Sequence, residues 1–361
     1  MIRHRRSMGC HDSKNRIQVC KNTVGKKILT DFAESKQYKY NRTVMRKRGH
    51  MRKTEAMINE IEKVIIGKRE VIEQVLMTIL AKGHVLLEDI PGVGKTSLAL
   101  AFAKVLDLEQ NRVQFTPDVL PADITGFSLY RKELGSFEYQ EGAVMCNLFL
   151  ADEINRTSPK TQSALLEAME ERNVTVDGIT HVLPEPFHVI ATENPIGSAG
   201  TQMLPESQLD RFMISLQIGY PEKQDELKIL MSRDRTNPMD ALQPVIFRDE
   251  LKEMQRLTEE VRIHQVIYEY IINLVDATRK NEMIELGVSP RGALALAKMA
   301  KASAFLSGRS YVIPNDVSDV FRNVAEHRIR LSSKGRLNHL TAEKVLGEVL
   351  DTVKKPVPQR R

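Results

Sequence analysis

The chain has 361 residues, of which 42% are hydrophobic and 28% are charged, enough for one large core and a smaller second domain. No apolar run approaches the roughly 18 residues that a membrane-spanning helix needs, and the first residues contain no apolar block typical of a secretory signal. The 3 cysteines, Cys10, Cys20 and Cys146, form no Cys-x-x-Cys pair, which argues against a disulfide framework or a zinc site. We therefore expect a cytoplasmic protein that is not inserted in a membrane.

The net charge of +6 is distributed unevenly along the chain. Residues 1–53 hold 16 Lys and Arg against 3 Asp and Glu, which leaves 37 against 44 for the remainder. Because this segment has neither helical nor strand periodicity, we expect a disordered basic tail or a start codon assigned too far upstream of Met45, Met51 or Met57. A nucleic-acid-binding arm is the third interpretation. We expect a second disordered tail at residues 354–361.

An amphipathic pattern begins near residue 54, and short apolar runs typical of buried parallel strands follow it. These runs are residues 84–88, 113–116, 148–152, 188–193 and 214–218. Residues 97–106 are apolar at helical spacing, and Ser158 and Pro159 provide an N-cap and a first-turn proline for another helix. The alternation of strands and helices predicts a three-layer α/β core over residues 54–221.

Two segments of this core do not fit the alternation and predict short hairpins instead. Residues 174–180 contain Asp177-Gly178 between β-branched residues, which is a tight-turn signal. Residues 127–139 predict a second hairpin around Gly135.

After residue 221 the strand patterns end. Residues 222–350 are predicted to be helical throughout, with breaks at glycines and prolines. We divide this part into a linker with the start of a lid, residues 222–278, and a helical lid domain, residues 279–353.

The segment Pro91-Gly92-Val93-Gly94-Lys95-Thr96 follows a predicted strand and opens a predicted helix. In this context backbone N–H groups at the helix N-terminus can surround a phosphate, and the glycines allow its close approach. Lys95 would reach the β- and γ-phosphates of ATP, and Thr96 would offer its hydroxyl to Mg²⁺. The usual pattern has Gly where this chain has Asp89. We assign to nucleotide binding Gly67, Glu88, Asp89, Ile90, Pro91, Gly92, Val93, Gly94, Lys95, Thr96 and Ser97.

The predicted strand at 148–152 ends in Asp152 and is followed by Glu153. A carboxylate at the carboxyl end of a parallel strand can hold Mg²⁺ directly or through water, and its neighbour can polarise an attacking water. A solvated pair of acids is the alternative for this motif in isolation. The next predicted strand is followed by Asn194, whose amide could hold the same water or the γ-phosphate. We therefore predict catalytic roles for Lys95, Glu153 and Asn194.

Two arginines are candidates for contact with the γ-phosphate. Arg211 precedes the fifth predicted strand and lies too far around the sheet to serve its own nucleotide, so it suits an arginine finger given to a neighbouring subunit. Its alternative is a surface ion pair with an adjacent acid such as Asp210. Ser289 and Pro290 are predicted to begin a helix, so Arg291 would project from the first turn and could touch the γ-phosphate. Without these companion motifs, Arg291 would be a solvated charge.

Several motifs taken together resemble the MoxR group of AAA+ ATPases. They are residues 86–96, 120–126, 151–156, 165–172, 191–195, 204–206 and 208–212. The resemblance implies an α/β fold, a P-loop NTPase three-layer αβα core with a five-stranded parallel sheet, followed by a small all-α lid domain. It also implies that an acid at position 89 is a subgroup feature, that Asn194 is the residue called sensor 1 and that Arg291 is sensor 2.

The same resemblance implies hydrolysis of Mg-ATP to ADP and phosphate at the subunit interfaces of a homo-oligomeric ring, commonly a hexamer. It implies a chaperone-like remodelling or assembly role on protein clients, often with a von Willebrand factor A domain protein as partner. The two predicted hairpins would be exposed insertions and our candidates for client contact.

Other functions share parts of this pattern. The motor subunit of a metal-chelatase-like complex would have the same ATPase motifs, and a nucleotide-gated scaffold would bind ATP without turnover. A DNA-associated ATPase is disfavoured, because the predicted hairpin tip is Asp177-Gly178 and not basic. A GTPase would need an Asn-Lys-x-Asp motif, which is absent, and a dinucleotide-binding loop would place its third glycine on Ser97.

Overall fold

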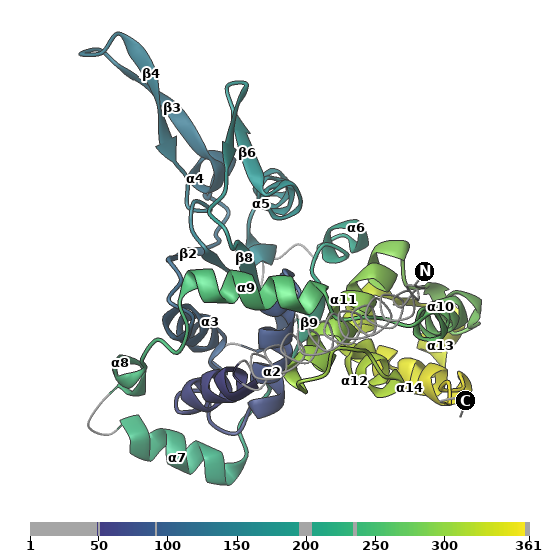
Figure 1. Ribbon diagram of the computed structural model, residues 1–361. Helices are drawn as coiled ribbons and strands as arrows, with labels where there is room; N and C mark the ends of the chain where they lie inside the picture. The colour runs from purple at the N-terminus through teal and green to yellow at the C-terminus, as the bar shows by residue number, and fades with distance from the viewer. Residues whose placement is uncertain (1–48, 50, 91, 195–203, 234–236, 358–361) are drawn as a thin grey trace, which may run out of the picture. The chain divides into compact units, whose positions relative to one another are not determined.

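The structure is a computed structural model that describes residues 49, 51–90, 92–194, 204–233 and 237–357. The described residues from Met51 onward belong to one compact unit (Figure 1). The expectations for residues 1–48, Pro91 and 358–361 fall outside the described residues. Cys146 lies within them as a buried free thiol, and burial raises its pKa to about 12.

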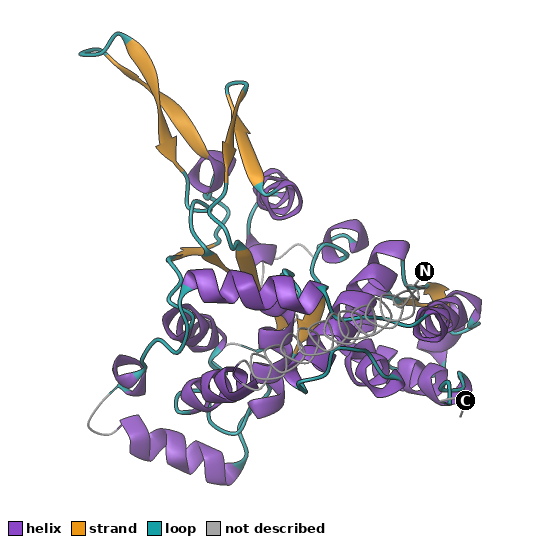
Figure 2. Ribbon diagram, viewed as in Figure 1, coloured by secondary structure: helices purple, strands orange, loops and turns teal. Residues whose placement is uncertain are grey.

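The core sheet has five parallel strands in the order β2-β5-β8-β1-β9. Figure 2 draws the strands of the protein in orange. Its members are β1 (Val85–Glu88), β2 (Gln110–Gln114), β5 (Leu148–Asp152), β8 (His188–Glu193) and β9 (Ile214–Leu216). The predicted five-stranded parallel sheet is therefore confirmed. The edge strand β2 begins at Gln110 and not at Val113, because exposed polar residues alternate along it and leave no continuous apolar run to detect.

Helices cover both faces of this sheet. The helical elements of this part of the chain include α2 (Arg69–Leu80), α3 (Lys95–Val105), α4 (Pro121–Thr125), the 3-10 turn η1 (Ile154–Arg156), α5 (Pro159–Glu171) and α6 (Glu206–Leu209). Side chains that alternate along β5 enter two different buried clusters. Leu148 and Leu150 pack with residues of α2 and α3, whereas Phe149 and Ala151 pack with residues of α5. The predicted three-layer core is confirmed by this division.

Two helices begin with the predicted Ser-Pro pattern. The Ser158 hydroxyl accepts a hydrogen bond from the backbone N–H of Thr161 at the start of α5. The Ser289 hydroxyl accepts one from Gly292 at the start of α11 (Pro290–Leu306). Each cap satisfies a backbone donor that the helix cannot pair internally, so the first turn is fixed in position.

Two antiparallel hairpins project side by side from the core, where the sequence predicts them (Figure 1). In the first, β3 (Gly126–Arg131) pairs with β4 (Ser136–Glu141), and in the second, β6 (Asn173–Val176) pairs with β7 (Ile179–Val182). The ring of Tyr139 stacks on that of His181 with centroids 3.7 Å apart, which joins the hairpins. Large apolar side chains stay exposed on them, namely Phe127, Leu129, Tyr130, Leu134, Phe137, Ile179 and Val182.

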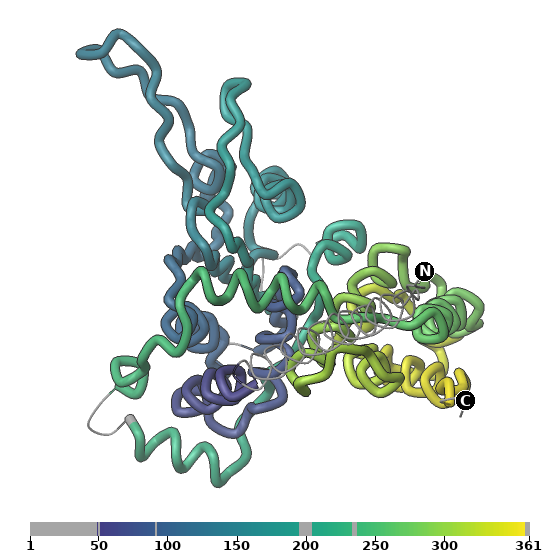
Figure 3. The backbone as a smooth tube through the Cα atoms, in the orientation of Figure 1, coloured from purple at the N-terminus to yellow at the C-terminus, as the bar shows by residue number. Residues whose placement is uncertain are grey.

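The chain after β9 is mostly helical (Figure 3). Its helices are α7 (Lys223–Arg233), α8 (Pro238–Ala241), α9 (Arg248–Glu259), α10 (Gln265–Lys280), α11, α12 (Pro314–Ala325), the 3-10 turn η2 (Glu326–Arg328), α13 (Ser333–Leu337) and α14 (Ala342–Thr352). One antiparallel pair, β10 (Ile284–Leu286) with β11 (Arg330–Leu331), corrects the expectation of an uninterrupted helical region. Strands this short show no recognisable period in a sequence. Within the described ranges, no helix combines the length and apolar character that a membrane crossing requires.

Two buried histidines lie at the amino end of the sheet. Nδ1 of His188 lies 2.9 Å from the carbonyl oxygen of Gly83, and its Nε2 lies 3.0 Å from Nε2 of Gln255, so Nδ1 donates and Nε2 accepts. Burial lowers the pKa of His188 to about 4 and that of His84 well below the usual value. Both rings are therefore neutral in the folded protein at physiological pH.

We predict that His188 makes folding stability fall as the solution is acidified. Between about pH 6.5 and pH 4 the unfolded chain binds a proton at this histidine and the folded chain does not, so stability rises with pH across that window. The contribution is on the order of 3 kcal/mol. Urea unfolding of His188→Gln at pH 4.5, 5.5 and 7 should show a shallower pH dependence than the wild type, whereas the exposed His339→Gln should keep it. Equal slopes in the wild type and His188→Gln would contradict this prediction.

Candidate functional site

The loop that joins β1 to α3 has open space beside Gly92 and Gly94. Gly92 and Gly94 have φ values of +87° and +97°, in the left-handed region that residues other than glycine rarely adopt. A Cβ built at either position would meet no atom within 4 Å. Lys95 donates from Nζ to the carbonyl oxygens of Asp89 at 2.5 Å and Glu193 at 3.2 Å. Burial lowers the pKa of Lys95, although the neighbouring acids oppose the shift. The loop can admit an anionic group beside this ammonium.

Asp89 occupies the position where the usual loop has glycine, and its carboxylate is buried. Oδ1 accepts from the N–H of Ile90 at 2.7 Å, and Oδ2 accepts from the N–H of Gly219 at 2.6 Å. Gly219 follows β9, so the acid ties the loop to the end of a neighbouring strand. Charge-assisted bonds of this kind are among the stronger hydrogen bonds in proteins. The departure from the usual pattern thus has a structural role in this chain.

Asp152 ends β5 directly beside the loop. The Thr96 hydroxyl donates to its Oδ2 at 3.3 Å, and the Thr192 hydroxyl donates to its Oδ1 at 2.6 Å. A hydroxyl and a carboxylate that converge in this way fit the oxygen ligands that Mg²⁺ prefers, so the predicted pair suits the ion. The Arg112 guanidinium on β2 also donates to Oδ2, at 2.8 Å. No local sequence pattern singles out Arg112, because only the pairing of β2 with β5 brings it there.

Glu153 and Asn194 lie at the same edge of the sheet. Glu153 has φ +56°, a strained conformation for a residue with a side chain and one that often marks functional positions. Its carboxylate accepts from Nε2 of Gln114 at 2.8 Å and from Nη1 of Arg156 at 2.7 Å. Asn155 donates from Nδ2 to the carbonyl oxygen of Asn194 at 3.2 Å. The structure therefore brings the predicted lysine, acids and asparagine to one place.

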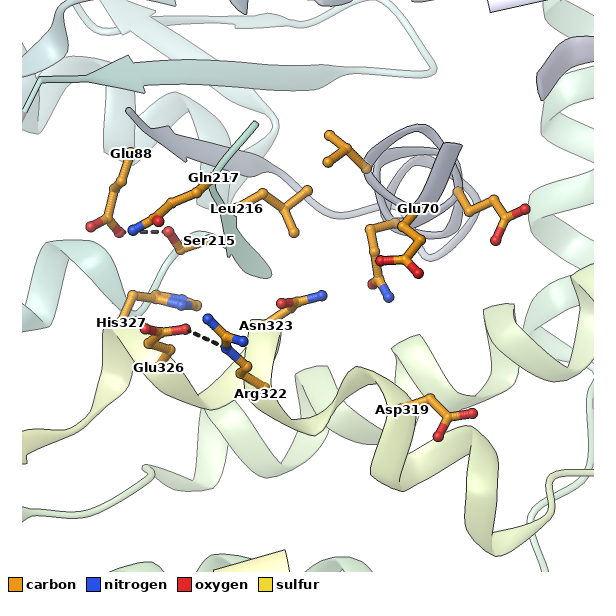
Figure 4. Close-up of a pocket in the computed structure, with 13 residues that line it drawn as sticks. Glu70, Glu88, Ser215, Leu216, Gln217, Asp319, Arg322, Asn323, Glu326 and His327 are labelled. Carbon is orange, nitrogen blue, oxygen red and sulfur yellow. Dashed lines mark hydrogen bonds and ion pairs between the residues drawn. The ribbon is translucent and has the colours of Figure 1, made fainter. Parts of the chain in front are cut away.

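Two of the predicted nucleotide-binding residues, Glu88 and Gly67, make contacts away from the phosphate-binding loop. The carboxylate of Glu88 turns toward β9, where it accepts from the Ser215 hydroxyl at 2.5 Å and lines a cavity of about 630 Å³ with residues of α2 and α12 (Figure 4). Gly67 lies against Asp225 at the start of α7, where a Cβ would come within 2.0 Å of a carboxylate oxygen. Side-chain contact between Glu88 and a phosphate in the loop is thus disfavoured, and nucleotide contact by Gly67 stays a prediction.

Arg211 and Arg291 meet at one carboxylate, that of Glu170 on α5. Nη2 of Arg291 pairs with Oε1, and Nε of Arg211 lies 3.4 Å from Oε2 without the alignment of a hydrogen bond. Both arginines line a cavity of about 380 Å³ together with Gly83 and His84, which precede β1.

This position separates Arg291 from the phosphate-binding loop of its own chain, and its contact with a γ-phosphate stays a prediction. The loop follows β1, whereas the arginine cavity is lined by residues that precede it, and a strand of 4 residues spans about 13 Å. Arg291 lies with Arg211 because α11 begins beside the segment that carries Arg211. The two arginines therefore lie at the amino end of the strands, and the loop and acids at the carboxyl end.

Known proteins resemble this chain over most of its length. A family model described as the ATPase family associated with various cellular activities matches residues 84–214, and an AAA lid domain model matches residues 276–349. The uncharacterised protein YeaC of Bacillus subtilis is 48% identical over 83% of this chain and 94% of its own length. Chaperone MoxR1 of Mycobacterium tuberculosis is 39% identical over 85% of this chain and 84% of its own length. The chain belongs to the MoxR group of AAA+ ATPases.

A solved structure agrees with this assignment to the MoxR group. A crystal structure of a Cytophaga hutchinsonii protein, provisionally named an ATPase, matches with a TM-score of 0.80 and 34% sequence identity, and it covers 89% of this chain and 99% of that protein. The core and the lid of the MoxR-type fold are thus both shared with a solved protein.

Glu193 is a titratable group of this MoxR-type site that the sequence did not single out. It ends β8 and is buried beside Glu88 and Lys95. Burial, reinforced by the charge of Glu88, raises its pKa to about 7, although Lys95 opposes the shift. Its charge therefore changes near physiological pH, close to the loop.

We predict that Asp89→Gly, which restores the usual glycine of the loop, lowers both the folding stability of the protein and its affinity for nucleotide. It removes two charge-assisted bonds to backbone N–H groups, so the free energy of unfolding should fall by about 1.5–3 kcal/mol and nucleotide affinity should drop. Urea unfolding and titration with a fluorescent ATP analogue measure the two effects. Asp177→Gly, at an exposed turn with positive φ, is the matched control and should change neither quantity. An Asp89→Gly protein as stable and as tight in binding as the wild type would refute the structural role.

We predict that nucleotide affinity falls as pH rises through about 7, because Glu193 then becomes ionised and repels the phosphates. The loss should be roughly 1 kcal/mol, a few-fold in the dissociation constant. Titrations from pH 6 to pH 8 should show this fall in the wild type but not in Glu193→Gln, which cannot ionise. The titration of the nucleotide itself is common to both proteins, so parallel pH curves would rule out the effect.

Proposed function

We propose that this chain hydrolyses Mg-ATP to ADP and phosphate at the subunit interfaces of a homo-oligomeric ring, which we expect to be a hexamer. The observation that carries this proposal is the separation of two sets of residues within one subunit. The loop, Asp152 and Glu153 lie at the carboxyl ends of the strands, whereas Arg211 and Arg291 lie at the amino ends. A complete site then needs two subunits.

On the loop side, each predicted residue has a role that fits its position. The N–H groups of the loop and Lys95 would bind the β- and γ-phosphates, and Thr96 and Asp152 would hold Mg²⁺, which offsets phosphate charge when bound. Glu153 would take a proton from water as its oxygen bonds to the γ-phosphorus, while the bond to the β–γ bridging oxygen breaks. Asn194 would orient that water.

On the arginine side, the cavity is suited to an anion from a neighbouring subunit. Its basic side chains are Lys82, Arg172, Arg211, Arg291, Lys298 and Arg328, and its acidic ones are Glu170 and Asp210. In the free subunit, the one carboxylate of Glu170 contacts both arginines and offsets one of their two positive charges. We propose that the neighbour's γ-phosphate replaces Glu170, so that Arg211 acts as an arginine finger and Arg291 assists it in trans.

We propose that the energy of hydrolysis serves the remodelling or assembly of protein clients. The exposed apolar side chains of the two hairpins support this role, because patches of this kind commonly contact other proteins. The name of the relative MoxR1 as a chaperone agrees with it. A von Willebrand factor A domain protein is our expected partner.

We predict that ATPase activity depends on assembly. The rate per subunit should rise with protein concentration, because a monomer lacks the arginines that its site requires. Lys95→Ala should lose nucleotide binding, Glu153→Gln should bind ATP without turnover, and Arg211→Ala should lose about a thousandfold or more in rate. The exposed Arg256→Ala is the control and should retain full activity.

A mixing experiment tests the trans arrangement directly. Lys95→Ala subunits keep the arginines, and Arg211→Ala subunits keep the loop, so a mixture of the two inactive proteins should regain activity. A rate that is independent of concentration, together with no recovery on mixing, would show that the site is complete within one chain.

A further inference from the structure

One carboxylate links the segment that carries Arg211 to the helix that carries Arg291. Asp210 directly precedes Arg211, and its Oδ2 accepts from the hydroxyl of Ser289 at 2.8 Å. Ser289 is also the N-cap of α11, and Arg291 lies in the first turn of that helix. A core residue and a lid residue next to the two arginines are thus bonded to each other.

Arg328 holds the same segment from a second side. This arginine of η2 is 5% exposed, and its Nε donates to Oδ1 of Asp210 at 2.7 Å. Nη2 donates to the carbonyl oxygens of Asp210 at 3.1 Å and Phe212 at 2.5 Å, and Nη1 donates to that of Met213 at 3.1 Å. The lid therefore binds backbone on both sides of Arg211.

The buried guanidinium of Arg328 is costly to displace from these partners. A guanidinium has five N–H donors and no acceptor, and a buried one must keep its partners or leave a desolvated charge unpaired. Any rotation of η2 away from the core would break several of these bonds together, and a shift of α11 would break the bond from Ser289 to Asp210. The segment around Arg211 and the start of α11 must then move as one body.

Glu170 shows that the two arginines already face a common anion. Its two carboxylate oxygens contact Arg291 and Arg211 respectively, although one arginine comes from the lid and the other from the core. Two guanidiniums at fixed spacing can engage one anionic group without reorganisation on binding.

We infer that Asp210, Ser289 and Arg328 form a clamp that fixes Arg211 and Arg291 as one unit, so that both reach the neighbouring subunit's γ-phosphate together. The three are positioning residues, because they act through the arginines and do not touch the phosphate. The inference rests on the proposed trans function. It also means that the lid of one subunit follows the nucleotide state of its neighbour, since α11 and the segment around Arg211 cannot separate.

The test uses the mixture of Lys95→Ala and Arg211→Ala subunits. The first is the donor of arginines, and the second is the acceptor that holds ATP. Each clamp substitution, Ser289→Ala, Asp210→Asn or Arg328→Lys, is placed in the donor in one mixture and in the acceptor in another. Thermal melting and the assembly of each variant are measured alongside, and Ser332→Ala is the matched control because Ser332 caps α13 in the same way without touching Asp210.

In the donor, the clamp variants should lower the regained kcat about tenfold or more with KM for ATP unchanged, and Ser289→Thr should restore it. In the acceptor, whose arginine edge is already inactive, the same changes should leave the regained rate as it was.

Equal losses in donor and acceptor would overturn the clamp and indicate a merely structural role, and full activity of the donor variants would overturn it as well. If Arg328→Lys fails to fold, Ser289→Ala and Asp210→Asn decide. No recovery even with an unmodified donor would overturn the trans function, and the clamp with it.

Discussion

All five strands of the core sheet run in the same direction, and this constraint places most of the candidate site residues. Parallel pairing gathers the carboxyl ends of β1, β5 and β8 at one edge, so the residues that follow them meet there although they are far apart in the sequence. The same pairing puts the residues that precede β1 and β9 at the opposite edge. Arg211 lies in that second group, and the lid brings Arg291 to it.

Charge is divided between the two edges in a complementary way. The carboxyl edge holds Asp89, Asp152, Glu153 and Glu193 around a single lysine of the loop, and burial keeps the pKa of Glu193 high. The amino edge has an excess of cations around Glu170. Acidic groups would repel ATP unless Lys95, the N–H groups of the loop and a metal ion offset them. Arginines from a neighbouring subunit would add positive charge beside the bound γ-phosphate, which the chain's own arginines at the amino edge do not reach. This is the physical reason to expect assembly.

Much of the fold follows from local sequence signals. Apolar runs, Ser-Pro helix starts and Asp-Gly turns each depend on a few adjacent residues, so the strands at 148–152 and 188–193, the capped helices and both hairpins are predicted correctly. The motif residues of the loop and the acid pair are found for the same reason, because each motif is contiguous and lies at a strand end.

The residues that sequence analysis missed depend on contacts between distant segments. Arg112 and Gln114 reach the acid pair only through the register that pairs Gln114 with Asp152. Asp210 and Arg328 are 118 positions apart, and no periodicity relates them. The place of Arg291 beside Arg211 was not predicted either, since its helix start is local but the direction in which the lid docks is set by tertiary packing. Local patterns thus identify the candidate residues, and the packing of core on lid decides where Arg291 lies.

The most direct test of this division is to find which chain the γ-phosphate touches. An ATP analogue with a photoreactive aryl azide on the γ-phosphate would be bound to mixed rings of unlabelled wild-type chains and isotope-labelled Lys95→Ala chains, then irradiated and analysed by mass spectrometry. Our account predicts adducts on labelled peptides that contain Arg211 or Arg291, although those chains cannot hold the nucleotide in their own loops. Adducts confined to the unlabelled chains would contradict it and return the arginines to the subunit that binds the ATP.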